Sequence, residues 1–215
     1  MENVVIIGAG DFSKLIIDIL TARNKVNKEY NILGLIDDNK KVDEEINGYR
    51  ILGDFNWIDN NADKDFKVIC SVAEPETKRK LIERSLKRDL EFINAIHPDT
   101  TISDFCEISS KGVIINAGVI IAANVILEPY TLVNFNSTVG HDVILRKYAS
   151  VMPGVNLAGF VELKEGAYIG MNSALIQNVS VGEYSTIGAG AVVVKDIPDD
   201  VTAVGIPAKV VKRNN

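Results

Sequence analysis

The fold of this chain is decided by residues 139–174, which read VGHDVI LRKYAS VMPGVN LAGFVE LKEGAY IGMNSA when they are cut every six residues. The first residue of each hexad is a large aliphatic, and the fifth is small or β-branched. The same cut runs without an insertion from Ser109 to Val192, which makes fourteen hexads over 84 residues. Thirteen of the fourteen first positions are large aliphatics, so two positions of the hexad keep one period.

A six-residue period of this kind indicates a parallel β-helix with three short strands to a coil. Eighteen residues per coil stack Val139 under Leu157 and Leu175, with coils about 4.8 Å apart. The stack buries the aliphatic column that one coil leaves exposed, and backbone N–H and C=O groups pair with the next coil. A β-sandwich would show period-two alternation and hairpin turns, which this stretch lacks.

Strands and helices alternate ahead of the repeats. Strands are expected over 4–7, 31–36 and 67–72, helices over 13–23 and 75–88, and an extended segment over 91–96. This order predicts a small parallel sheet with both faces covered. We therefore expect an α/β plus all-β chain, with a Rossmann-like βαβ domain over residues 1–97 and a β-helix domain over residues 98–215.

The turn Gly8-Ala9-Gly10 resembles the start of a dinucleotide fingerprint, but the third glycine is Ser13, so NAD binding is a weak alternative. Free N–H groups at a helix N-terminus still suit an anionic ligand, and ligands of open α/β sheets bind at the carboxyl ends of the strands. Those ends carry Gly10, Asp11, Asp37, Asp38 and Ala73. The alternative for the acidic pair is a solvated exit from the strand.

Composition excludes some classes of partner. The formal net charge of −6 and the pI near 5.0 argue against a nucleic-acid binder, because phosphates are held by clustered Lys and Arg. No stretch has the length of a signal peptide's apolar region or of a membrane span, so a cytoplasmic protein is expected. Cys70 and Cys106 lack metal-ligand spacing.

His141 is the one histidine inside the repeats, in the segment TVGHDV. An imidazole titrates near neutral pH, so a single histidine on a rigid scaffold is a candidate general base. Zinc catalysis on such a scaffold needs three histidines, whereas this chain has only His97 besides, so no metal is expected. The alternative for His141 is a surface histidine that forms hydrogen bonds and has no catalytic role. His97, beside Pro98, is expected to be structural.

The hexads, the run VMPGVNLAG over 151–159 and the close VGIPAK over 204–209 resemble the left-handed β-helix acyltransferases. The α/β half, with GAG at 8–10, IDD at 36–38 and IHP at 96–98, resembles the NeuD/PglD branch, which contains nucleotide-sugar N-acetyltransferases and sialic-acid O-acetyltransferases. The resemblance covers essentially the whole chain. It implies left-handed coils, a homotrimer with the active site between subunits, acetyl-CoA as co-substrate, and a nucleotide sugar on the α/β domain.

The resemblance also implies roles for single residues. His141 matches the general base, Asp142 the acidic neighbour that orients it, and Asn134 a substrate contact. Gly159 lies one coil on from His141 and matches a glycine whose backbone meets CoA. Gly10, Asp37 and Asp38 match the nucleotide site, and Met171, Ala189, Pro207 and Lys209 match the CoA groove. Two positions depart from the family: Asp11-Phe12 replaces Gly-His, and Ser150 replaces a second histidine near the acyl group. A serine can still donate a hydrogen bond, so Ser150 is expected to contact the cofactor.

These observations predict transfer of the acetyl group of acetyl-CoA to the amino group of a UDP-4-amino-4,6-dideoxy-hexose type of substrate, for surface glycan biosynthesis. A thioester is already activated, so the amine attacks it directly once a base removes a proton. O-acetylation of sialic acid or a related nonulosonic acid is the first alternative. A non-catalytic trimeric module that binds sugar nucleotides is the second.

Overall fold

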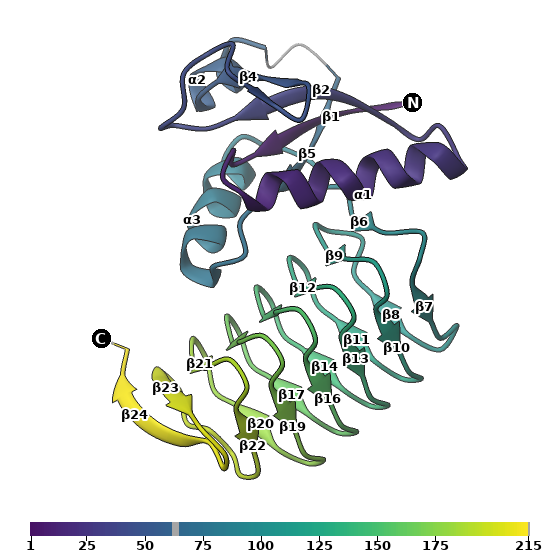
Figure 1. Ribbon diagram of the computed structural model, residues 1–215. Helices are drawn as coiled ribbons and strands as arrows, with labels where there is room; N and C mark the ends of the chain where they lie inside the picture. The colour runs from purple at the N-terminus through teal and green to yellow at the C-terminus, as the bar shows by residue number, and fades with distance from the viewer. Residues whose placement is uncertain (62–64, 215) are drawn as a thin grey trace.

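The computed structural model describes residues 1–61 and 65–214, so Asn215 at the end of the expected second domain lies outside the described residues. An α/β layer lies over one side of a triangular stack of coils, above the first coils (Figure 1). Within the described residues, no helix is long and apolar enough to cross a membrane.

The N-terminal part is built on a five-stranded sheet in the order β3-β4-β2-β1-β5. Its elements are β1 (Glu2–Ile7), α1 (Phe12–Val26), β2 (Tyr30–Ile36), β3 (Glu45–Ile46), β4 (Tyr49–Gly53), α2 (Phe55–Asp59), β5 (Lys67–Cys70) and α3 (Pro75–Leu86). Strands β1, β2, β4 and β5 pair in parallel, whereas β3 pairs with β4 as an antiparallel hairpin. The predicted strands and both long helices are present; the hairpin and α2 were not predicted.

Each of the three faces of the prism is a ladder of short parallel strands. The first face holds β6 (Ala95–Ile96), β9 (Ile114–Ile115), β12 (Leu132–Val133), β15 (Ser150–Val151), β18 (Tyr168–Ile169), β21 (Thr186–Ile187) and β23 (Val201–Val204), and ends on antiparallel β24 (Lys209–Arg213). The second face holds β7 (Thr101–Ile102), β10 (Ile120–Ile121), β13 (Thr138–Val139), β16 (Asn156–Leu157), β19 (Ala174–Leu175) and β22 (Val192–Val193). The third face holds β8 (Glu107–Ile108), β11 (Ile126–Leu127), β14 (Ile144–Leu145), β17 (Glu162–Leu163) and β20 (Ser180–Val181).

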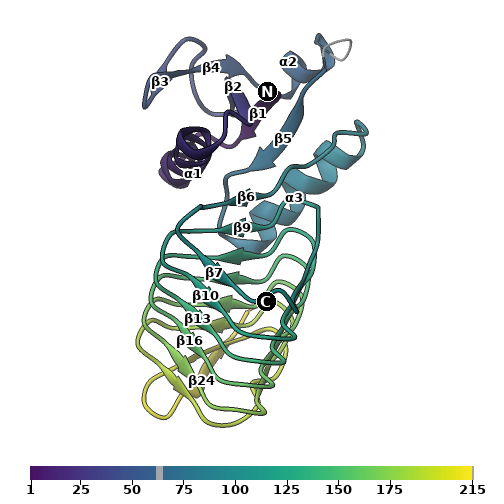
Figure 2. The same ribbon diagram turned by 90° about the vertical axis from the view of Figure 1, so that its right-hand side faces the viewer.

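The register confirms the coil length and the left-handed β-helix. Val139 pairs with Leu157, and Leu157 with Leu175, at the predicted spacing of eighteen residues. The first and fifth hexad positions together fill the interior of the prism. Figure 2 shows the triangular outline along the stack. The ladder begins earlier than the hexads read from the sequence, because β6 already pairs with β9.

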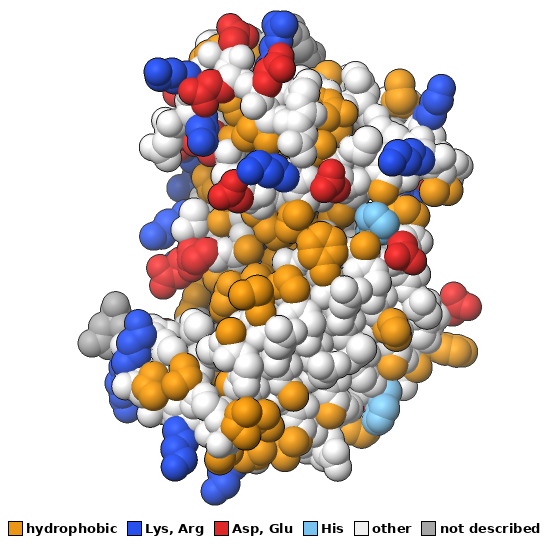
Figure 3. Space-filling model, in the orientation of Figure 1, with side chains coloured by type: hydrophobic (Ala, Val, Ile, Leu, Met, Phe, Trp, Pro, Cys, Tyr) orange, Lys and Arg blue, Asp and Glu red, His pale blue; other side chains and the backbone are white. Residues whose placement is uncertain are grey.

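The α/β layer packs on the first face of the prism through α1 and α3. One apolar cluster joins α1 to the outward side chains Ile114, Leu132 and Met152 of the coils. Hydrophobic side chains gather along this junction in Figure 3. A second cluster brings Tyr130 and Tyr148 of two corners against Phe92 and the sheet. The division at residues 97/98 stays a prediction.

Candidate active site

The imidazole of His141 lies outside the prism, at the corner between the second and third faces. Its Nδ1 is 2.7 Å from Oδ2 of Asp142, and 59% of its side chain is exposed. The hydrogen bond from His141 holds the pKa of the Asp142 carboxyl below its usual value. An ionised carboxylate only accepts hydrogen bonds, so Nδ1 carries the proton and Nε2 presents its lone pair.

Asp142 adopts a left-handed backbone conformation, with φ of 58°, which turns its side chain back along the corner. Its second oxygen, Oδ1, accepts a hydrogen bond of 3.2 Å from Nδ2 of Asn124, the residue one coil earlier at the same corner. The carboxylate is therefore held from two sides, by the imidazole it orients and by an amide of the neighbouring coil. Asn124 was not predicted, although counting eighteen residues back from Asp142 finds it.

Gly159 lies directly against the imidazole, as the coil count predicted. A Cβ at this position would come within 2.6 Å of Cε1 and 2.7 Å of Nε2 of His141. The next residue, Phe160, places its ring edge-on to the imidazole, with centroids 5.1 Å apart and planes at 88°. Only a residue without a side chain lets the ring occupy this place on the corner.

A second concave site lies at the carboxyl ends of β1, β2 and β5. Its cavity of about 510 Å³ is lined by sixteen residues, which include all five that the strand ends suggested: Gly10, Asp11, Asp37, Asp38 and Ala73. Asp37 closes the site from β2, because its carboxylate accepts from the N–H groups of Ala9 and Asn39, each at 2.8 Å. The crossover order of the parallel strands produces this crevice.

The other acidic side chains at the second site are already paired. Asp38 forms an ion pair with Arg84 of α3, and that guanidinium lies 3.9 Å from the centroid of the Phe55 ring. Asp11 is fully exposed and binds Lys14 at 2.8 Å, a contact that lowers the pKa of its carboxyl. The predicted acidic pair therefore consists of one carboxylate that holds the glycine turn and one that anchors a helix.

Comparison with known proteins bears on both sites. The model of the PglD N-terminal domain matches residues 3–85, and that of the bacterial transferase hexapeptide (six repeats) matches residues 160–195. GDP-perosamine N-acetyltransferase of Escherichia coli O157:H7 is 28% identical, over 97% of this chain and 96% of that protein. The two models and these relatives support an acetyl-CoA-dependent sugar acetyltransferase of the PglD/NeuD type.

Solved structures agree with this assignment. A histidine-to-asparagine variant of perosamine N-acetyltransferase from Caulobacter crescentus, in complex with CoA and GDP-perosamine, superposes with a TM-score of 0.91 at 28% identity, covering 99% of this chain and 98% of that one. The acetyltransferase domain of PglB from Neisseria gonorrhoeae FA1090, in complex with acetyl coenzyme A, gives 0.89 at 28% identity, covering 98% and 99%.

Of the predicted cofactor residues, Gly159 lies against His141, whereas Met171, Ala189, Pro207 and Lys209 lie away from it within one chain, as does the predicted substrate contact Asn134. Asn134, Met171 and Ala189 follow strands of the first face and lie at the corner between the first and second faces. His141 lies at the opposite edge of the second face. Asn134 is buried, Met171 and Ala189 are exposed, and Pro207 and Lys209 lie exposed at the β23–β24 hairpin.

Ser150 of the acetyltransferase is buried between β15 and α3. Its hydroxyl donates to the carbonyl of Ala73 at 2.8 Å and accepts from the ammonium of Lys78 at 2.7 Å. Burial lowers the pKa of the Lys78 amine to about 7. A cofactor contact by Ser150 requires this bridge to open, so that role stays a prediction. The bridge itself ties α3 and the segment ahead of it to the coils.

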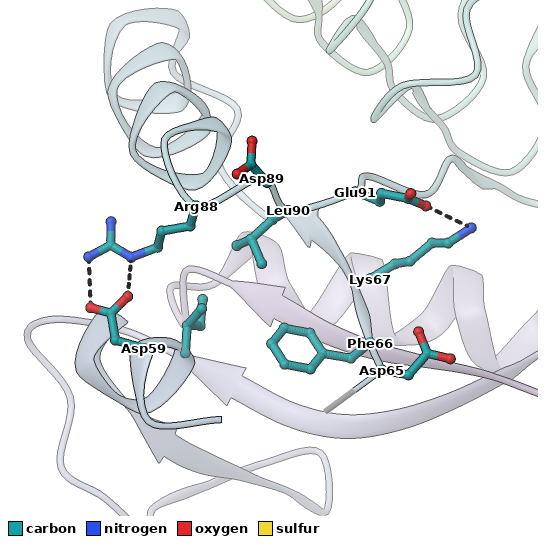
Figure 4. Close-up of a pocket in the computed structure, with 9 residues that line it drawn as sticks. Asp59, Asp65, Phe66, Lys67, Arg88, Asp89, Leu90 and Glu91 are labelled. Atoms are coloured by element: carbon teal, nitrogen blue, oxygen red, sulfur yellow. Dashed lines mark hydrogen bonds and ion pairs between the residues drawn. The ribbon is translucent and has the colours of Figure 1, made fainter. Parts of the chain in front are cut away.

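A further hollow of about 540 Å³ lies at the amino end of β5, away from the predicted site residues (Figure 4). The Arg88 guanidinium donates two hydrogen bonds to the Asp59 carboxylate there, of 2.6 and 2.9 Å. Within residues 1–61 and 65–214, the acetyltransferase has no group of three or more His, Cys, Asp or Glu side chains that could hold a metal ion.

Proposed function

We propose that this acetyltransferase moves the acetyl group of acetyl-CoA to the amino group of a nucleotide-linked 4-amino-4,6-dideoxyhexose, in the biosynthesis of a surface glycan. The observation that carries the proposal is His141, whose Nδ1 lies 2.7 Å from Asp142, while no hydrogen bond from the described residues reaches Nε2, which lies beside Gly159. Names of relatives support N-acetylation, because the proteins from Escherichia coli and Caulobacter crescentus are both called perosamine N-acetyltransferases.

The reaction proceeds by direct attack. The amine nitrogen of the sugar bonds to the thioester carbon, the C–S bond breaks, and the CoA thiol leaves. His141 accepts the proton that the amine loses, at Nε2, and Asp142 holds the imidazolium that forms. The imidazolium then gives this proton to the departing sulfur, so that CoA leaves as the thiol. General-base catalysis of this kind contributes about 10²- to 10⁴-fold in rate, and alignment of the two substrates supplies the rest.

The cavity at the strand ends of the α/β layer is the proposed nucleotide-sugar site. The Gly8–Gly10 turn at the start of α1 borders it; the N–H groups of Gly8 and Ala9 donate to Ile36 and Asp37, so an anionic diphosphate would bind at Gly10 and the N-terminus of α1. Asp37 stabilises that turn through the Ala9 N–H. A UDP sugar was predicted from the sequence, and the relatives named for GDP-perosamine make a GDP sugar the second nucleotide to test.

The division of the site between two corners supports a trimer. Asn134, Met171 and Ala189 lie at one edge of the second face and His141 at the other. When prisms pack side by side, the His141 corner of one copy meets the opposite corner of the next. The base of one copy and the cofactor-binding residues of its neighbour then line a single groove, so the active site forms between subunits.

Thiol release from acetyl-CoA, with UDP- and GDP-linked 4-amino-4,6-dideoxy sugars as acceptors, tests the proposal. Release should require the acceptor amine and should fall by at least about 10²-fold in His141→Ala, while calorimetry shows unchanged nucleotide-sugar binding. His141→Asn is the matched variant, because it keeps a polar side chain and lacks a base. Release that persists in both variants refutes the general base. Release only with a nonulosonic acid favours O-acetylation, and sugar-nucleotide binding without release for any acceptor favours the non-catalytic module.

A further inference from the structure

Phe160 is an exposed aromatic ring on a strained backbone beside the proposed base. Its φ is 60°, in the left-handed region that residues with a Cβ rarely adopt, and 55% of its surface is exposed. The residues at the same corner in the coils before and after it are Asp142 and Asn178, which tolerate this conformation. An Asn at position 160 would satisfy the backbone, so the fold of the corner does not explain the Phe.

Other aromatic residues with the same backbone conformation have a packing reason for it. Tyr130 and Tyr148 have φ of 65° and 62° and are buried, with their rings stacked 5.5 Å apart beneath the α/β layer. Tyr184 lies under Arg79 of α3, 5.5 Å from its ring centroid, and donates to Glu165. Phe160 touches none of these elements. Its ring partner is the imidazole of His141, 5.1 Å away.

The chemistry next to Nε2 indicates what covers the Phe160 ring. In direct attack the acceptor amine lies between Nε2 of His141 and the thioester carbon, so the acyl-thioester comes close to the imidazole. The pantetheine chain behind the thioester begins with methylene groups and carries two amides further along. The amino sugar has one methyl group, at C6, and hydroxyls on most of its ring, so it offers the Phe160 ring less apolar surface than the donor does. Gly159, without a side chain, leaves the backbone beside the ring open on the same side.

We infer that Phe160 is a specificity-determining residue for the acyl donor: its ring forms the apolar wall against which the thioester end of acyl-CoA packs. Backbone strain that is retained at a site and relieved by no packing is typical of a functional position. This inference rests on the proposed function, since it takes acyl-CoA as the donor, but it concerns binding of CoA and not proton transfer.

The test is calorimetric titration of acetyl-CoA and CoA into the full chain and into Phe160→Asn, with no acceptor present. Loss of an aromatic surface that is about half exposed should raise the Kd of acetyl-CoA about fivefold to tenfold. The Tm should rise by about 2 °C, because Asn relieves the left-handed backbone. Binding of the sugar nucleotide and the oligomeric mass should stay unchanged. Phe160→Leu, which keeps an apolar side chain, should recover part of the affinity.

Phe105→Asn is the matched control, because Phe105 is 75% exposed and, by the strand register, lies three coils before Phe160 at the same corner position. It should leave the Kd of acetyl-CoA unchanged. An unchanged Kd in Phe160→Asn overturns the inference, and so does a loss of affinity that comes with a smaller oligomeric mass, which assigns Phe160 to a subunit contact. If thiol release proves independent of His141, the general-base role of His141 is refuted. The role of Phe160 in binding acetyl-CoA is still tested separately by the Kd values.

Discussion

Gly159→Ala should abolish most of the activity while leaving the fold intact. The added Cβ would lie 2.6 Å from Cε1 and 2.7 Å from Nε2 of His141, about 1 Å inside ordinary van der Waals contact. Gly159 has an ordinary backbone conformation that Ala also adopts, so the clash falls on the exposed imidazole, which has room to move. A displacement of about 1 Å at a reacting group costs about 10²-fold in rate. The expected loss in kcat is therefore about 10²-fold, with a change in Tm below about 2 °C.

A double-mutant cycle on thiol release isolates the cause. In the His141→Ala background no imidazole remains to be displaced, so adding Gly159→Ala should change kcat by less than about twofold. The difference between this small change and the loss of about 10²-fold in the wild-type background corresponds to a coupling free energy of roughly 2–3 kcal/mol between the two residues. Equal losses in both backgrounds would show that Gly159→Ala acts on the CoA path or on the coil. An active Gly159→Ala enzyme would refute the placement of the base against Gly159.

Three further perturbations follow from the packing. Burial lowers the pKa of the folded Lys78 amine from 10.5 to about 7, so between these values the unfolded state binds more protons and the free energy of unfolding rises with pH. The free energy of unfolding of the wild-type protein, measured by urea titration, should rise relative to that of Lys78→Met by up to about 1.4 kcal/mol per pH unit from pH 7 to 10. The same pH dependence in both proteins would contradict this. Asp37→Ala frees the N–H of Ala9 and should weaken sugar-nucleotide binding about tenfold in calorimetry, with acetyl-CoA binding unchanged; equal affinity would assign Asp37 to stability alone. Gly166→Ala, at φ of 65° and with a Cβ that would clash with the Tyr184 ring, should cost about 2–4 kcal/mol in denaturant unfolding. Gly190→Ala, at φ of 69° in open space, should cost only the backbone share of about 1–2 kcal/mol.

The prediction of the β-helix succeeded because its signal is local and repeated. Each hexad carries its own inward aliphatic, so the period predicts both the strand and the coil partner, and pairs such as Val139 with Leu157 follow by counting. The hairpin of β3 and β4 was missed, because two-residue pairing around Asn47 and Gly48 leaves almost no hydrophobic pattern to read.

Counting residues along the coils also predicted the contact between His141 and Gly159 in the candidate active site. His141 and Gly159 are eighteen residues apart, so the sequence placed one against the other, and the structure has them in contact. The strand-end residues likewise lie around one cavity. The same count could have found Asn124 and Phe160, which share a corner with Asp142.

By itself, the sequence determined the solenoid, its coil length, the order of the two parts and the stacking of His141 on Gly159. In a periodic chain every hexad forms the same strand and turn, so the neighbours in the next coil follow from counting residues. Only the tertiary structure decided which polar groups have a partner within the chain: Asp38 forms an ion pair with Arg84, and Ser150 accepts a hydrogen bond from Lys78. Those partners come from α3, which packs across the junction, and no period relates α3 to the coils. Side-chain partners between unrelated elements depend on how two surfaces meet, and that is set by the packing of the whole chain.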